Sequence, residues 1–155
     1  METESSRTER SAIILDHVTV TRSGLSILDN VNASIPAGSC TVFIGPNGAG
    51  KTTLLHALLG EVSYEGRIDF GPRMPRIGYV PQKLALDRGM PFSVGEFLSM
   101  GVQRRPLWLG LSAASKQQAG HLLELVHAAH LMRRRVGTLS GGEMQRVLLA
   151  LALRR

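Results

Sequence analysis

This 155-residue chain has little cysteine and no long apolar run, and both absences exclude classes of protein. Cys40 is the only cysteine, so the sequence can form neither an internal disulfide nor a zinc site built from several thiolates. It lies in an apolar run, which predicts a small buried residue in a protein of a reducing compartment. The longest uninterrupted apolar run, 147–153, has seven residues, whereas a membrane-spanning helix needs about 20. We therefore expect a soluble or peripheral protein.

Apolar residues, positive charge and glycine are plentiful by contrast. A hydrophobic content of 43% is enough for one globular domain. The 18 Lys and Arg outnumber the 12 Asp and Glu, so we expect an anionic partner: a nucleotide, a nucleic acid or an acidic lipid surface. Glycine is in excess with 17 residues, and the excess clusters at 45–50 and 137–142, which makes these segments the first candidates for chemistry. Residues 1–11 are polar without an apolar core, which predicts a flexible tail and not a signal peptide.

Hydrophobic patterning predicts an α/β chain, with strands in its first half and helices in its second. Gly60 is placed to end a helix at its C′ position, and the Ser93 to Glu96 spacing is that of a capping box. Apolar residues recur at helical spacing from Leu122 to Ala129 and again from Met144 to Leu151. We expect strands at 13–20, 26–35, 39–44, 66–70 and 76–80, a loop at 103–110, and helices at 51–59, from 93, at 112–131 and from about 141 to the last residue.

Residues 45–52 read Gly-Pro-Asn-Gly-Ala-Gly-Lys-Thr and match G-x-x-x-x-G-K-[ST] between a predicted strand and a predicted helix. Glycines let backbone N–H groups curl around an anion, and the helix N-terminus adds partial positive charge. Lys51 is expected to reach the β- and γ-phosphates, and the Thr52 hydroxyl to ligate magnesium. A simple connecting turn has no use for Lys followed by Thr, so we predict nucleotide binding. GTPases, kinases and transport ATPases share this loop, and the loop alone does not choose among them.

A second glycine-containing turn, 139–143, precedes the predicted C-terminal helix and reads Leu-Ser-Gly-Gly-Glu. Ser140 can cap that helix, while Gly141 and Gly142 leave its first N–H groups accessible to an external anion. An ordinary N-cap would explain Ser140 and Glu143 but not two consecutive glycines. We therefore predict a second phosphate-binding turn.

With these motifs, the chain resembles the ATP-binding subunit of ABC transporters. Residues 45–52 resemble the Walker A motif, Gln82 in Tyr-Val-Pro-Gln resembles the Q-loop, and 139–143 resemble the signature motif. The three motifs occur in the family's order, and the resemblance covers nearly all of 12–155. The sequence has no Asn-Lys-x-Asp guanine-reading motif, which argues against a GTPase.

The resemblance implies an α/β P-loop NTPase fold of the ABC type, with an antiparallel β portion and a helical subdomain at about 84–137 of a single domain, 12–155. It implies a head-to-tail homodimer in which ATP and Mg²⁺ on the Walker A motif of one subunit are closed over by Ser140 and Gly142 of the other. Lys51 and Gln82 would act in catalysis, and Thr52 and Gln82 would hold the metal. The implied nucleotide contacts are Gly45, Pro46, Asn47, Gly48, Ala49, Gly50, Lys51, Thr52, Thr53, Ser140, Gly141, Gly142, Glu143 and, at the adenine-stacking position, Arg22.

The sequence departs from the family pattern in two places. Arg22 stands where the family usually has an aromatic ring; its guanidinium plane can lie on a base, and an exposed turn arginine is the equal alternative. The family's next strand, which ends in Asp-Glu, and the switch histidine after it are absent, and no Asp-Glu pair occurs in these residues. Because that strand lies beside the phosphate-loop strand in the family, we expect an unpaired edge and aggregation. We also expect nucleotide binding with very slow turnover, because the Asp-Glu carboxylates position magnesium and water.

The function implied by the resemblance is ATP binding, and hydrolysis in the complete domain, to drive transport through a separate membrane permease. A substrate-binding protein would be an indirect partner and no nucleic acid is expected; the location would be cytoplasmic, on the inner face of the plasma membrane. Residues 76–101 resemble the ATPases of zinc, manganese or iron importers. Two alternatives stay open: a soluble, non-transport ABC ATPase, and a binding-only fragment.

Three further sequence features are interpreted as structural and not as functional. His127 and His130 have an i, i+3 spacing that suits a metal, but nothing near them in sequence supplies further ligands. The arginine run 133–135 is interpreted as a solvated helix end in preference to a lipid or nucleic-acid contact. Trp108 is interpreted as a core residue in preference to a contact with a membrane-embedded partner.

Overall fold

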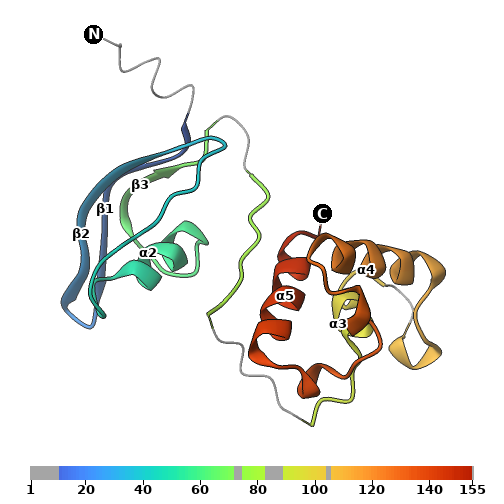
Figure 1. Cartoon of the computed structure of the whole chain (residues 1–155). Helices are drawn as coiled ribbons and strands as arrows, with labels where there is room; N and C mark the ends of the chain where they lie inside the picture. The colour runs from blue at the N-terminus through green and yellow to red at the C-terminus, as the bar shows by residue number, and fades with distance from the viewer. Residues whose placement is uncertain (1–10, 72–74, 83–88, 104–105, 155) are drawn as a thin grey trace. The chain divides into compact units, whose positions relative to one another are not determined.

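The computed structural model describes residues 11–71, 75–82, 89–103 and 106–154 of the chain. The chain divides into two compact units, Met1–Pro75 and Arg76–Arg155 (Figure 1). The strands and one helix belong to the first unit, and the second unit is helical in its described part. None of the helices in the described ranges is long and apolar enough to cross a membrane.

The first unit is built on a three-stranded antiparallel sheet of β1 (Ser11–Arg22), β2 (Leu25–Pro36) and β3 (Glu65–Asp69), in the order β2-β1-β3. Ser23 and Gly24 join β1 to β2, with φ of 51° and 78°. A two-residue turn with both φ values positive matches the right-handed twist of a hairpin. The three strands that were predicted for these regions are confirmed, although Ser11, assigned to the tail, is already part of β1. The rest of the predicted tail, 1–10, lies outside the described residues.

Helix α2 (Lys51–Leu58) packs against this sheet and completes its core. Leu54 and Ala57 are buried one helical turn apart, and they meet buried strand residues such as Val18, which is fully buried. Gly60, with φ of 72°, follows the helix as predicted. The sheet and α2 together position the loop that connects them. The buried members of this core are Leu15, Val18, Val20, Leu28, Leu54 and Ala57.

The prediction of a strand at 39–44 is wrong, because this segment pairs with no strand in the described part of the chain. Phe43 packs against the core of the first unit, whereas Val42 is 70% exposed, Ile44 is 92% exposed and Cys40 is exposed instead of buried. A run of strong β-formers becomes a strand only when a neighbour satisfies its N–H and C=O groups. No backbone hydrogen bond of 40–44 with another described residue is recorded, so this apolar segment lacks such a neighbour there.

The second unit contains three α-helices and three short 3₁₀ turns in its described part. Helices α4 and α5 and the short α3 enclose an apolar core in which Val94, Leu123 and Val147 are fully buried. The predicted capping box at Ser93 and the predicted helix starting at 141 are both confirmed. The elements are α3 (Val94–Ser99), η1 (Leu107–Leu109), α4 (Ala113–Leu125), η2 (Ala129–Leu131), η3 (Val136–Thr138) and α5 (Gly141–Ala152).

Three predictions for the second unit are wrong. Segment 76–80 forms no strand. The helix predicted over 112–131 ends at Leu125, which is 56% exposed, and His127 then adopts a positive φ of 53° before the separate turn η2. Trp108, which was assigned to the core, is 82% exposed in η1. In the last two cases the chain turns away at a point where the apolar pattern alone predicted continued packing.

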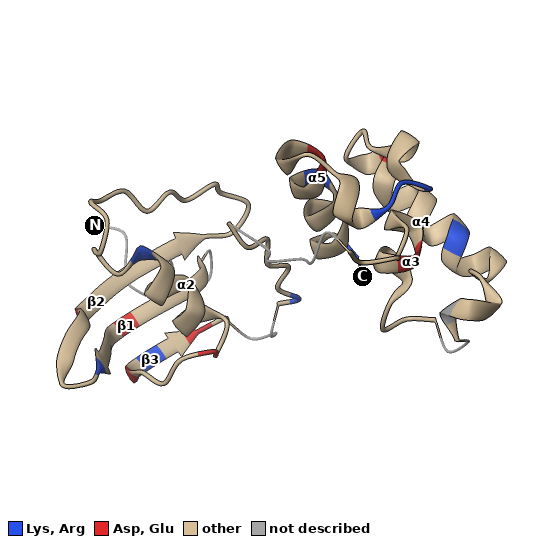
Figure 2. Ribbon diagram, turned by 90° about the horizontal axis from the view of Figure 1, so that it is seen from below, with Lys and Arg blue, Asp and Glu red and all other residues tan. Residues whose placement is uncertain are grey.

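Charge is distributed unevenly between the two units. The first 75 residues contain six Lys or Arg and eight Asp or Glu, and the remaining 80 contain twelve and four. Acidic positions lie on β1 and β3 of the first unit (Figure 2). The positive charge of the chain therefore comes from the second unit, and any cation in the first unit acts locally.

Candidate functional site

The loop 45–50 holds Lys51 in a defined position at the start of α2. Its ammonium group, Nζ, donates to the carbonyl oxygens of Gly45 at 2.9 Å and Pro46 at 2.7 Å. The loop itself is closed by a 3.3 Å hydrogen bond from the Ala49 N–H to the Pro46 carbonyl. The cation therefore folds back over the loop that it follows in sequence.

The N-terminus of α2 leaves its backbone donors available. Its N-cap is Gly50, in a left-handed conformation with φ of 80°, and no side chain caps the helix. No acceptor among the described residues is recorded for the N–H groups of Gly48, Thr52 and Thr53. The first turn of α2 contains no acidic residue. Free N–H groups, a helix N-terminus and a lysine are a donor set that fits a phosphate chain.

Close packing against β2 requires glycine at position 50. A Cβ atom there would lie 2.6 Å from a Leu28 methyl group and 2.8 Å from the Ile27 carbonyl oxygen. The same residue has a positive φ, which side chains rarely adopt. Gly50 thus lets the loop turn into α2 directly against the sheet, which fixes the direction of the free N–H groups.

The predicted site residues fall into both units. In the first unit, residues 45–49 and Thr52 are exposed, and Lys51 and Thr53 are half-buried. Arg22 is exposed at the end of β1, where it pairs with Leu25 across the hairpin turn. Gln82 is exposed in the second unit, which also contains the turn 139–143. The structure thus places the residues predicted to form the Walker A motif in one loop, and those predicted to form the signature motif in another turn.

Ser140 caps α5 through a reciprocal capping box. Its hydroxyl accepts from the Glu143 N–H at 3.4 Å and donates to Glu143 Oε2 at 2.9 Å, and its own N–H donates to Oε2 at 2.8 Å. Gly141 and Gly142 are exposed, and a Cβ at either position would meet open space. The predicted cap is confirmed, and the two glycines have no packing role in the structure.

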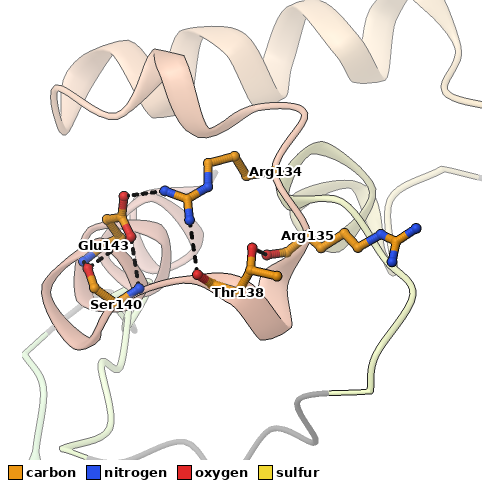
Figure 3. A network of polar contacts seen from close by, with 5 residues as sticks. All are labelled: Arg134, Arg135, Thr138, Ser140 and Glu143. Carbon is orange, nitrogen blue, oxygen red and sulfur yellow. Dashed lines mark hydrogen bonds and ion pairs between the residues drawn. The ribbon is translucent and has the colours of Figure 1, made fainter.

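Sequence reasoning missed Arg134, which holds Glu143 from the other side (Figure 3). Its Nη1 donates to Glu143 Oε1 at 2.6 Å, and its Nη2 donates to the Thr138 carbonyl at 3.0 Å. The hydrogen bonds from the Ser140 N–H and hydroxyl hold the pKa of the Glu143 carboxyl below its ordinary value, and the positive charges of Arg134 and His130 lower it further. Of the three arginines that were interpreted as a solvated helix end, Arg134 is therefore bonded to the turn 139–143 and its flanking residue Thr138.

Comparisons with known proteins give consistent results. The profile of the ABC transporter family matches residues 28–155. The zinc import ATP-binding protein ZnuC of Paramagnetospirillum magneticum is 43% identical over 149 residues, 94% of this chain and 52% of the relative. The protein of the same name from Pseudomonas putida is 44% identical over 146 residues, 92% of this chain and 52% of the relative. The chain therefore spans about half the length of these curated relatives.

Solved structures show the same fold. An inward-facing putative metal-chelate type ABC transporter matches with a TM-score of 0.77 and 26% identity, over 94% of this chain and 56% of the other. An ATP-binding cassette of an ABC transporter in its ADP conformation matches with a TM-score of 0.76 and 27% identity, over 93% of this chain and 65% of the other. The fold is the predicted α/β P-loop core of an ABC ATPase, and this chain belongs to the ABC transporter family.

Proposed function

We propose that this chain is the ATP-binding part of an ABC importer for a metal ion, in which ATP binding and hydrolysis drive transport through a separate membrane permease. The observation that carries the proposal is the α2 N-terminus, where Lys51 and uncapped backbone N–H groups lie at one glycine-built loop. An incoming phosphate offers Lys51 charged oxygens in place of the Gly45 and Pro46 carbonyls. Charge-assisted hydrogen bonds of this kind are stronger than neutral ones.

Two of the predicted site residues offer oxygen atoms to magnesium, which prefers hard oxygen ligands. The Thr52 hydroxyl is exposed directly after Lys51, and Gln82 provides an exposed amide oxygen in the second unit. Bound Mg²⁺ would neutralise phosphate charge. Thr52 and Gln82 would hold it, and Gln82 would also orient the attacking water and report the nucleotide state to the permease. Arg22, exposed at the hairpin turn, would lie on the adenine base.

The turn 139–143 would act on the nucleotide bound by a second copy. Its glycines have no packing role, and its exposed position leaves Ser140 and Gly142 accessible to an external phosphate. The proposed assembly is a head-to-tail homodimer, at the inner face of the plasma membrane, bound to a permease that also meets a substrate-binding protein. Both units would then belong to one domain, 12–155, with a helical subdomain at about 84–137.

The transported ion is proposed from the relatives. Proteins named as zinc import ATP-binding proteins share 39–44% identity with this chain over more than nine-tenths of its residues. Cargo would meet the permease and the binding protein, and not this chain. A change in zinc uptake on deleting the gene, with unchanged uptake of manganese and iron, would assign the ion; unchanged zinc uptake would contradict the assignment.

Binding is tested with the 155-residue chain and its Lys51→Ala variant by calorimetric titration with Mg-ATP. Loss of the charged hydrogen bonds is expected to weaken binding by about 2 kcal/mol, or about 30-fold. Arg67→Ala is the matched control, because Arg67 lies in the same unit and its guanidinium pairs with Asp69 on β3. Equal affinities for the parent and Lys51→Ala would refute nucleotide binding at this loop.

Turnover is tested separately, by steady-state phosphate release. The 155 residues contain no Asp-Glu pair, so the proposal predicts turnover well below about 1 per second, the lower end of typical enzymes. Turnover near that value would contradict it.

The same preparation tests the exposed apolar segment 40–44: aggregation is expected on heating, and a sharp, reversible transition of the monomer would contradict that expectation.

A further inference from the structure

Glu143 lies at the centre of a polar network at the start of α5 (Figure 3). Its Oε1 accepts from the Arg134 guanidinium at 2.6 Å, and its Oε2 accepts from Ser140 twice, at 2.8 Å and 2.9 Å. Arg134 extends the network to the Thr138 carbonyl. Both carboxylate oxygens are thus occupied, one by a cation and the other by the helix cap.

The negative charge of Glu143 conflicts with the role proposed for this turn. Ser140 and Gly142 are proposed to contact a phosphate, and Glu143 is bonded directly to Ser140. Like charges at such short range repel each other strongly near a protein surface. The turn therefore suits an anion only if the Glu143 charge is offset, and the Arg134 guanidinium is the cation that contacts it.

The Ser140 hydroxyl adds a second constraint, because it has a single proton. In the structure that proton is donated to Glu143 Oε2. To donate to a phosphate, the hydroxyl must turn away, and Glu143 then loses one partner. Arg134 and the Ser140 N–H remain to hold the carboxylate, so the cap geometry survives the change.

The backbone on both sides of Arg134 is fixed by the start of α3. The Val94 N–H donates to the Arg134 carbonyl at 2.9 Å, and the Gly95 N–H donates to the Met132 carbonyl at 3.0 Å. Ser93 and Arg135 form a β-bridge beside them. These bonds use main-chain atoms only, so a side-chain substitution at position 134 removes the guanidinium and leaves its anchor in place.

We propose that Arg134 is a positioning residue for the turn 140–142: it offsets the charge of Glu143 and holds its carboxylate, so that the Ser140 hydroxyl is free to turn to a phosphate. The inference rests on the proposed function and names a residue that the three motifs do not include. Arg134 itself touches no nucleotide in this account and acts through Glu143.

The variant that tests the inference is Arg134→Gln, with Arg135→Gln as its matched control. Both substitutions remove one positive charge from the same segment. The Arg135 guanidinium points away from the network, and none of the contacts recorded for the described residues involves it (Figure 3). Self-association of the chain in Mg-ATP, measured by sedimentation, is expected to weaken about tenfold in Arg134→Gln and less than twofold in Arg135→Gln. Arg134→Lys, which keeps the charge, is expected to recover part of the loss.

A double substitution separates this role from a general structural one. Glutamine at position 143 keeps the capping-box pattern without the charge, so Glu143→Gln should make Arg134 dispensable. We expect Arg134→Gln to have less than a twofold effect in the Glu143→Gln background, which is the result a double-mutant cycle gives for residues that act through each other. A merely structural role, through the Thr138 carbonyl, would leave the tenfold loss in place in that background.

The outcomes are distinguishable from failure of the proposed function. Mg-ATP affinity that does not respond to Lys51→Ala refutes nucleotide binding, whatever the arginine variants do. Lys51-dependent binding with equal effects of Arg134→Gln and Arg135→Gln overturns only this inference. So does an undiminished effect of Arg134→Gln in the Glu143→Gln background, or a parent chain that binds Mg-ATP through Lys51 and never self-associates.

Discussion

Helices α2 and α5 both start at a glycine-containing turn, yet their N-termini are built in opposite ways. Helix α2 has Gly50 as its N-cap, with no side-chain cap and no acid in its first turn, and Lys51 supplies a cation. Helix α5 has Ser140 as its N-cap, with a full capping box and an acid, Glu143, that the guanidinium of Arg134 neutralises. The first design leaves many donors for a chain of phosphates, and the second leaves room for one further contact. Under the proposed function, the loop before α2 would be the main site and the turn before α5 an accessory one.

The largest effect is expected from Gly50→Ala, which adds a methyl group at the turn before α2. A Cβ at position 50 would collide with the Ile27 carbonyl in a positive-φ conformation. Strain and overpacking together are expected to destabilise the first unit by about 3 kcal/mol. Hydrogen exchange of peptides from β1 and β2 measures this, with peptides from α4 as the internal control. Unchanged protection of β1 would show that the loop is not held against the sheet.

Ser140→Ala should have a smaller effect, confined to the second unit. It removes both side-chain bonds of the capping box, and loss of such a cap destabilises by about 1 kcal/mol. Exchange of peptides from α5 is the measurement, and Ser140→Thr, which keeps the hydroxyl, is the control. If the alanine and threonine variants exchange at the same rate, Ser140 is not needed as a cap.

Gly142→Ala should move stability in the other direction. A Cβ there meets open space inside a helix, and alanine is favoured over glycine in helices by up to about 1 kcal/mol. The account predicts a gain of about 0.5 kcal/mol in the α5 region and weaker self-association in Mg-ATP. Destabilisation of α5 would mean that the glycine has a packing role that the structure does not show.

The smallest expected effect is a pH dependence of the second unit. The folded pKa of Glu143 is lowered from its ordinary 4.5, so its contribution to stability is present above that value and is lost as the pH falls through the lowered pKa. Thermal unfolding is followed by the helical circular dichroism signal from pH 6 to pH 3. The Tm should therefore fall less steeply with decreasing pH in Glu143→Gln than in the parent. Parallel curves of Tm against pH for the two proteins would contradict a stabilising role of the Glu143 carboxylate.

Local patterns were enough to predict the elements whose partners lie nearby in sequence. The strands β1 and β2, the Gly60 stop of α2, the capping box at Ser93 and the helix cap at Ser140 were all predicted correctly. Segment 39–44 has the same β-forming character as β1, but a strand also requires a neighbour. That neighbour is not among the described residues, so a correct propensity led to a wrong prediction.

The candidate site residues also divide into those that the sequence predicts and one that it does not. Lys51, Thr52 and Ser140 stand at fixed spacings in motifs, and the sequence shows them directly. Arg134 lies nine residues before Glu143, and their contact depends on the path of η3 between them, which no periodicity encodes. Inside a run of three arginines, the one that binds a carboxylate has the same sequence signature as its solvated neighbours.

In the proposed dimer, the loop 45–50 of one copy and the turn 139–143 of the other bind the same nucleotide. Mixing Lys51→Ala with Ser140→Arg chains tests it, because a mixed pair has one site with an intact lysine from one copy and an intact serine from the other. Sedimentation of the mixture in Mg-ATP should show a dimer that neither variant forms alone. If the mixture associates no better than the separate variants while the parent does associate, the two turns do not act across copies and the account is wrong.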